Sequence, residues 1–169
     1  VRSFASIYNP KLAVDVLKAL KLKGINARLC MVGPEKDGSL EDTKLYANKI
    51  GVEVTFTGGL SKKDWIALSK DYNVFINTTN FDNMPVSVIE AMALGLPVVS
   101  TNVGGLPYLI DNNTDGLLVQ EKTVEPFVNA IINLKENQAL IDNLTLNARK
   151  KAESFGWETV KKQWMDLLN

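Results

Sequence analysis

Two carboxylates, Asp82 and Glu90, flank a stretch of the sequence that has no other charged residue. Glu90 is the single charged residue between Met84 and Val99. Taking an isolated ionised group out of water is costly, so a chain that keeps one in an apolar run usually gives it partners. Pro85 can begin a helix that contains Glu90, and the free amides of its first turn would then form a site for phosphate. The pattern therefore indicates an anion site between two acids.

A phosphate flanked by acids that accept hydrogen bonds from hydroxyl groups describes a nucleotide sugar. Ribose and hexose hydroxyls are neutral donors, so they can satisfy a carboxylate without bringing in another charge. The alternative interpretation is structural, with Glu90 bound to backbone amides or paired with Arg2. The spacing of the residues leaves both interpretations open.

The elements that must position these residues follow an α/β pattern, in which short β-branched or apolar runs alternate with amphipathic segments of helix length. We expect a Rossmann-like open parallel sheet of about six strands, with helices on both faces. The predicted strands are Val1–Phe4, Ala27–Val32, Val52–Phe56, Val74–Asn77, Pro97–Ser100 and Gly116–Val119. From about residue 124 to residue 169 the pattern predicts helices alone, with a break at residues 154–157.

Signals for helix ends separate the predicted strands. Asn9 precedes Pro10, a residue favoured at the first helical position. Ser39 and Ser61 are each followed three residues later by an acid, as at a helix start. The glycines that suit helix stops are Gly24, Gly51 and Gly95.

Ligands of an open parallel sheet bind at the carboxyl ends of its strands, so the loops after the strands are where we expect a site. Gly58 and Gly59 follow one predicted strand, and Gly104 and Gly105 follow another. Such pairs can expose backbone amides, although they are as often plain turns. The loop after Val32, GPEKDGS, has glycine spacing but lacks the lysine and hydroxyl residue of a phosphate loop. We exclude it, and no GxGxxG motif supports dinucleotide binding.

Composition excludes several other classes of protein. Lys and Arg together number 19, as do Asp and Glu, so no net basic charge would attract nucleic acid, and we exclude it as a partner. The chain has no histidine and a single cysteine, Cys30, which excludes histidine bases, histidine metal ligands and an internal disulfide. No apolar run is long enough to suggest a membrane span, and we expect a cytoplasmic protein.

The run DNMPVSVIEAMALGLPVVSTNVGG, residues 82–105, resembles the signature of the family 4 glycosyltransferases. In that signature an acid, seven residues and a glutamate precede AMAxGxPVV and a glycine pair. The segments FTGGLSKKD, NTDGLLV and FGWETVKKQW resemble further parts of the family. The resemblance covers nearly the whole chain. It implies that residues 1–169 are the donor-binding domain, the C-terminal half of a GT-B architecture, without the N-terminal acceptor domain.

The resemblance also implies roles for particular residues. Glu90 would bind the ribose hydroxyls, and Asp82 stands where the family usually has a glutamate that contacts the transferred sugar. Arg2 matches the family arginine that neutralises the diphosphate, whereas the family lysine expected some five residues beyond it is missing and Lys11 is the nearest cation. The remaining implied donor-binding residues are Gly58, Gly59 and Leu60 at the base, and Asn83, Met84, Pro85, Val86 and Ser87 at the sugar and diphosphate.

The implied reaction transfers a hexose from a nucleoside diphosphate sugar to a glycan, lipid or small-molecule acceptor. It would retain the anomeric configuration and use no metal and no cofactor, with Asp82, Glu90 and Arg2 as the catalytic residues. Arg2 and the amides before Glu90 would stabilise the charge that develops on the leaving phosphate. This half alone is expected to be inactive.

Other interpretations remain open at this stage. They are a GT-B sugar-nucleotide epimerase fragment and a nucleotide-binding module without catalysis. For the full enzyme, a peripheral contact with the inner face of a membrane is a further alternative. Phe155, Trp157 and Trp164 are expected to pack between the final helices.

Overall fold

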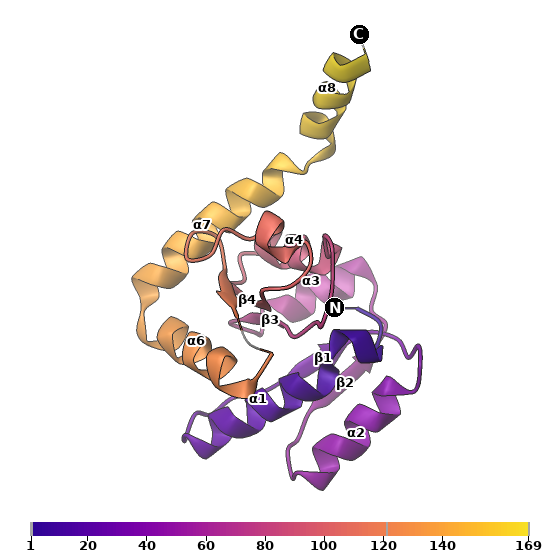
Figure 1. The fold of residues 1–169 in the computed structure, drawn as a ribbon, viewed down its shortest axis with the longest axis vertical. Helices are drawn as coiled ribbons and strands as arrows, with labels where there is room; N and C mark the ends of the chain where they lie inside the picture. The colour runs from indigo at the N-terminus through magenta and orange to yellow at the C-terminus, as the bar shows by residue number, and fades with distance from the viewer. Residues whose placement is uncertain (1, 121, 169) are drawn as a thin grey trace.

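The computed structural model describes residues 2–120 and 122–168, in which helices surround two small parallel sheets (Figure 1). In one sheet, β1 (Cys30–Val32) pairs with β2 (Thr55–Gly58). In the other, β4 (Val98–Thr101) lies between β3 (Phe75–Asn77) and β5 (Leu117–Val119). All of these pairs are parallel, which confirms the expected α/β class.

Helices lie on both faces of β4. Successive side chains of a strand point to opposite sides, so β4 packs against helices on each side. Val98 packs in a cluster with Met92, whereas its neighbour Val99 packs in a second cluster with Leu12 and Phe127. The helices are α1 (Pro10–Leu22), α2 (Ser39–Lys49), α3 (Lys62–Ser69), α4 (Val86–Ala93), α5 (Leu106–Leu109), α6 (Val124–Glu136), α7 (Gln138–Ser154) and α8 (Trp157–Leu168). A 3-10 turn, η1 (Ser6–Tyr8), precedes α1.

The prediction of six strands was wrong for the part of the chain that the structure describes, which has five named strands. Of the predicted strand Val1–Phe4, Val1 lies outside the described residues and only Phe4 forms a bridge, to Glu35. The Arg2 and Phe4 amides do donate to the Val32 and Pro34 carbonyls, at 3.0 and 2.8 Å. This segment therefore runs along the end of β1 without forming a strand of its own.

Most of the predicted helix ends are confirmed. The Ser61 side chain accepts a hydrogen bond from the Asp64 amide at 3.2 Å and caps α3. Each predicted stop glycine follows the last residues of a helix with a positive φ, which glycine adopts at no steric cost. These are Gly24, Gly51 and Gly95, with φ of 78°, 73° and 76°. Helix α2 begins at Ser39, as predicted, and Gly38 is its N-cap.

The chain ends in the three helices α6, α7 and α8, and the predicted break after residue 154 is confirmed. The prediction that the aromatic residues here pack between helices was wrong, since Trp157 and Trp164 are 68% and 57% exposed and Phe155 is 38% exposed. The reason is that α8 projects away from the sheets (Figure 1) and buries none of its residues. Within residues 2–120 and 122–168, no helix combines the length and apolarity needed to cross a membrane.

Candidate functional site

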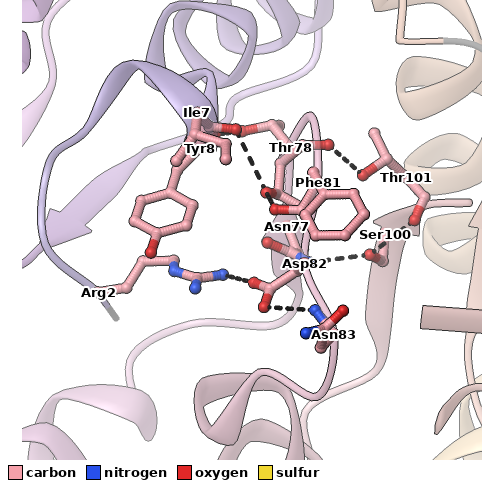
Figure 2. A network of polar contacts seen from close by, with 11 residues as sticks. Arg2, Ile7, Tyr8, Asn77, Thr78, Phe81, Asp82, Asn83, Ser100 and Thr101 are labelled. Atoms are coloured by element: carbon pink, nitrogen blue, oxygen red, sulfur yellow. Dashed lines mark hydrogen bonds and ion pairs between the residues drawn. The ribbon is translucent and has the colours of Figure 1, made fainter. Parts of the chain in front are cut away.

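The loops that leave β3 and β4 are joined by buried polar side chains at the carboxyl ends of the strands. The Asn77 side-chain amide donates to Ser100 Oγ at 3.0 Å (Figure 2). The Thr101 hydroxyl donates to the Thr79 carbonyl at 2.7 Å. These bonds hold residues 78–85, which contain Asp82, beside the loop that contains the glycine pair.

The glycine pair allows the two loops to touch through their backbones. A Cβ atom at Gly104 would lie 2.1 Å from the Asp82 carbonyl oxygen, and one at Gly105 would lie 2.2 Å from that of Asn83. The Gly105 amide donates to the Asp82 carbonyl at 2.7 Å. This pair therefore supports the Asp82 loop, and the Gly105 amide is not free to bind a ligand.

We expect Gly105→Ala to displace the Asp82 loop and to lower both the melting temperature and nucleotide affinity. Gly105 has a φ of −86°, so alanine would bring no backbone strain, and the effect would come from the contact with Asn83 alone. Gly59→Ala is the matched control for the melting temperature alone, because its new Cβ would meet only Pro34 Cδ, at 3.9 Å, whereas Gly59 is itself an implied donor-binding residue. Thermal unfolding and calorimetry would check the prediction, and equal falls in the melting temperature of the two variants would contradict it.

Arg2 and Asp82, 80 positions apart in sequence, form an ion pair (Figure 2). The other Asp82 oxygen accepts the Asn83 amide at 2.9 Å, and the guanidinium lies 3.6 Å from the centre of the Tyr8 ring. Both charged side chains are largely buried, at 24% and 14% exposed, and Arg2 Nε has no partner among the described residues. The structure thus brings two predicted catalytic residues together.

Gly33 fixes the position of the Arg2 backbone. A Cβ atom at Gly33 would lie 1.7 Å from the Arg2 carbonyl oxygen, so only glycine fits beside this segment. The Gly33 amide donates to the Gly58 carbonyl at 2.8 Å, at the end of β2. Gly33 therefore places Arg2 next to the Gly58 loop, which is a packing role.

Glu90 forms an ion pair with Lys62, the first residue of α3. The alternative prediction that Arg2 is its partner was wrong, because the Arg2 guanidinium pairs with Asp82. Lys62 is 66% exposed and Glu90 is 21% exposed, and exposed ion pairs contribute only about 0 to 1 kcal/mol. A ligand hydroxyl could replace the lysine at small cost. The prediction missed Lys62, whose only signal is its place directly after the TGGLS loop.

The start of α4 lies between the two acids. We predicted Pro85 as the first helical residue, whereas it is the N-cap and the helix begins at Val86. The amides of Val86 and Ser87 lie in the first turn of α4, where backbone N–H groups have no acceptor within the helix. Among the described residues, no side chain of the N-cap accepts a hydrogen bond from them. Such a helix start attracts anions, because it combines free amides with the positive end of the helix dipole.

Two other groups of predicted site residues have different surroundings. Gly58 ends β2, and Gly59 and Leu60 lead from it to α3, whose first residue, Lys62, pairs with Glu90 of α4. Lys11, by contrast, faces α2, with its ammonium 3.8 Å from the Asp42 carboxylate and 5.9 Å from the Tyr46 ring centre. The structure therefore does not bring Lys11 to the Arg2–Asp82 pair.

In the loop after Val32, which we excluded as a phosphate loop, a side chain of the loop itself binds the backbone amides. The Glu35 carboxylate accepts the amides of Lys36, Asp37, Gly38 and Leu40 at 2.6, 3.0, 3.0 and 2.9 Å. Desolvation raises the pKa of Glu35, but these four bonds together outweigh it and hold the pKa below its usual value. The amides that would bind a phosphate are thus already occupied by a carboxylate.

The sequence profile described as "Glycosyl transferases group 1" matches residues 1–151. The chain belongs to this family. It is 27% identical to a D-inositol 3-phosphate glycosyltransferase of Saccharomonospora viridis, over 99% of this chain and 42% of that protein. It is 33% identical to the amylovoran biosynthesis glycosyltransferase AmsK of Erwinia amylovora, over 53% of this chain and 22% of that protein. The chain thus spans less than half the length of these relatives.

Solved structures of glycosyltransferases share the fold. The Anabaena protein Alr3699/HepE in complex with UDP-glucose superposes with a TM-score of 0.86 at 20% identity, over 99% of this chain and 47% of that chain. The C-terminal domain of a group 1 family protein from Francisella tularensis gives 0.77 at 16% identity, over 92% of this chain and 83% of that domain. The fold is that of the C-terminal domain of a GT-B glycosyltransferase.

Proposed function

We propose that this chain is the donor-binding half of a retaining glycosyltransferase of family 4. The full enzyme would transfer a hexose from a nucleoside diphosphate sugar to a glycan, lipid or small-molecule acceptor. One observation carries the proposal. The uncapped start of α4 lies between two acids, Asp82 and Glu90, each of which is held by a cation.

In this proposal each part of the site binds one part of the donor. The amides of Val86 and Ser87 and the Arg2 guanidinium bind the diphosphate, where negative charge grows as the sugar leaves. Glu90 binds the ribose hydroxyls, which displace Lys62 from its exposed ion pair. Asp82 binds a hydroxyl of the transferred sugar. The proposed reaction uses no metal and no cofactor, because these groups stabilise the leaving diphosphate.

The acceptor would be bound by another domain of the full enzyme. The relatives named above are more than twice as long as the part that this chain matches. We propose that this N-terminal domain covers the start of α4 and excludes water from the reacting carbon. The half described here would then bind a nucleoside diphosphate with modest affinity and transfer no sugar.

We expect Glu90→Gln in the full protein to weaken binding of the matching nucleoside diphosphate at least tenfold. Glutamine has one carbonyl oxygen in place of a carboxylate, so the bonds to the ribose hydroxyls lose a charge assistance of about 1.5 to 3 kcal/mol. Glu53→Gln is the matched control, since Glu53 is an exposed acid before β2. Calorimetry that gives unchanged affinity at an unchanged melting temperature would remove Glu90 from the site.

A panel of nucleotide sugars tests the activity itself. Transfer by the full protein from at least one donor supports the proposal, and mass spectrometry of the product identifies the sugar. Conversion of one nucleotide sugar to another without an acceptor would instead show an epimerase. Tight binding of a donor without turnover, across a broad set of acceptors, would show a binding module.

We also propose a peripheral contact of the full enzyme with the cytoplasmic face of a membrane, through α8. Its exposed apolar residues Trp157, Trp164 and Leu168 accompany two exposed lysines, Lys161 and Lys162, and such a helix can lie in a membrane interface. We expect the full protein to sediment with vesicles of anionic lipid, and Trp164→Ser to reduce the bound fraction several-fold. Equal recovery of both proteins in the supernatant would contradict this contact.

A further inference from the structure

Tyr8 lies across one face of the Arg2 guanidinium (Figure 2). The guanidinium carbon is 3.6 Å from the centre of the ring. So short a distance means that the two planes are stacked, because a guanidinium whose N–H pointed at the ring would hold its carbon further away. Asp82 pairs with Nη1 of the same guanidinium. Arg2 is therefore held at one edge by a carboxylate and across one face by an aromatic ring.

The turn that contains Tyr8 is fastened to the loop that contains Asp82. The Thr78 hydroxyl lies 3.2 Å from the Tyr8 carbonyl oxygen and 3.0 Å from the next carbonyl oxygen along the chain, and it donates to them. The Asn80 amide donates to the Ile7 carbonyl at 2.8 Å. Thr78 and Asn80 both belong to the loop after β3, which leads to Asp82. These bonds hold the aromatic ring and the carboxylate, the two partners of the guanidinium, in one unit.

The residue after Tyr8 has a backbone conformation that is uncommon for a residue other than glycine. Asn9 has a φ of 47° and a ψ of 56°, in the left-handed region. It stands at the N-cap of α1, yet its side chain does not cap this helix. Such a conformation persists only where the surroundings fix it, and residues of this kind gather at functional sites. The bend lets the chain turn into α1 directly after Tyr8, which keeps the ring beside the site.

The ring leaves the edge of the guanidinium free for a ligand. All N–H donors of a guanidinium lie in its plane, and an aromatic ring stacked on one face takes none of them. Asp82 accepts one donor, from Nη1 of Arg2, and the buried Nε has no partner among the described residues. The donors that remain belong to the planar fork that matches a phosphate group. The stack thus decides the plane in which Arg2 offers these donors.

We infer that Tyr8 is a positioning residue, which holds the Arg2 guanidinium in the plane that meets the diphosphate at the start of α4. The inference rests on the proposed function for the identity of the ligand. Tyr8 acts through Arg2 and makes no bond to the ligand itself. Without the ring, the pair with Asp82 alone would let the guanidinium rotate about a single hydrogen bond. Affinity for the diphosphate would then fall with the fraction of molecules that keep the required plane.

A double-mutant cycle in the full protein tests this role. The probe is the nucleoside diphosphate that binds most tightly among ADP, GDP, CDP and UDP, measured by calorimetry. Tyr8→Leu removes the ring and keeps an apolar side chain, and we expect it to weaken binding about 3- to 30-fold, the range that a cation–π contact gives. In the Arg2→Met background the same change should weaken binding less than about twofold, because its partner is gone. Equal losses in the two backgrounds would show a purely structural tyrosine and overturn the inference.

Two further variants separate the ring from its hydroxyl and from a general effect of losing a tyrosine. Tyr8→Phe keeps the stack, so we expect it to bind the diphosphate as the original protein does. A loss as large as that of Tyr8→Leu would overturn the inference. Tyr72→Leu is the matched control, because the Tyr72 ring lies 5.5 Å from the Arg28 guanidinium and precedes β3, whereas Asp82 follows this strand. We expect Tyr72→Leu to leave the affinity unchanged, and a loss equal to that of Tyr8→Leu would count against the inference.

The same measurements distinguish failure of this inference from failure of the proposed function. If Arg2→Met weakens binding but Tyr8→Leu does not, the inference alone is overturned. If none of the nucleoside diphosphates binds, or if Arg2→Met leaves the affinity unchanged, the proposed diphosphate site is wrong and the inference is overturned with it. Melting temperatures show whether the variants fold, and Tyr8→Met takes the place of Tyr8→Leu in the cycle if the latter does not.

Discussion

Asp82→Asn in the full enzyme is expected to lower sugar transfer about 30- to 150-fold, because a charge-assisted hydrogen bond in the transition state contributes about 2 to 3 kcal/mol. The carboxylate lies beside the start of α4, where the transferred sugar would be bound. Asparagine keeps the size of the side chain but loses its charge. Steady-state kinetics with the native donor would measure the loss.

Comparison of two ligands separates the proposed role of Asp82 from a structural one. A carboxylate that binds a sugar hydroxyl matters for the full donor, and hardly at all for the bare nucleoside diphosphate. If Asp82 only pairs with Arg2 and accepts the Asn83 amide, Asp82→Asn would weaken binding of both ligands equally and lower thermal stability. Equal loss would therefore exclude the role in sugar binding.

Asp82→Glu tests the departure of this chain from the glutamate usual in the resembled family. The longer side chain would place its carboxylate about 1.5 Å, one C–C bond, further into the site. The Arg2 guanidinium already occupies the space beyond Asp82, so the added methylene would disturb this pair as well. We expect lower activity with the native sugar, since misplacement near the reacting centre is costly. Activity equal to the original enzyme would show that the pocket does not distinguish the two acids.

The parts of this fold that local sequence decides were predicted well. Glycine at a helix stop and a hydroxyl residue at a helix start act within one turn, and Gly24, Gly51, Gly95 and Ser61 behave as expected. The apolar strands were also found, within a few residues of their observed bounds. Their bounds shifted because pairing with a neighbouring strand, and not apolarity alone, decides where a strand begins.

Contacts between distant segments could not be predicted in the same way. Lys62 is one of many exposed lysines, and nothing local to it indicates that it meets Glu90 from another helix. Gly104 and Gly105 resemble a plain turn in sequence, and only the approach of the Asp82 loop shows why no side chain fits there. For the described residues of the predicted strand Val1–Phe4, the prediction failed because Arg2 bonds to Val32, the last residue of β1, and Phe4 bonds to Pro34 beyond it, where regular pairing stops.

We expect Arg2→Met to have the largest effect of any single substitution, a loss of about 100- to 1,000-fold in transfer, as when a preorganised donor to a developing charge is removed. The guanidinium stacks on Tyr8 and pairs with Asp82, so it is held in place before any ligand binds. Methionine keeps an unbranched, apolar side chain against the Tyr8 ring and removes only the charge and the donors. Single-turnover kinetics of the full enzyme would measure the change.

A graded set of ligands identifies what Arg2 binds. If the guanidinium faces the diphosphate, Arg2→Met should clearly weaken binding of the nucleoside diphosphate. It should hardly change binding of the phosphate-free nucleoside. Arg2→Lys should recover only part of the loss, because an ammonium keeps the charge but not the planar pair of donors that match phosphate. Asp82→Asn measured beside it gives the opposite selectivity, with the loss confined to the sugar-bearing donor. Should Arg2→Met leave diphosphate affinity unchanged and lower only the melting temperature, the ion pair with Asp82 would be structural, and the amides at the start of α4 would be left to bind the phosphates alone.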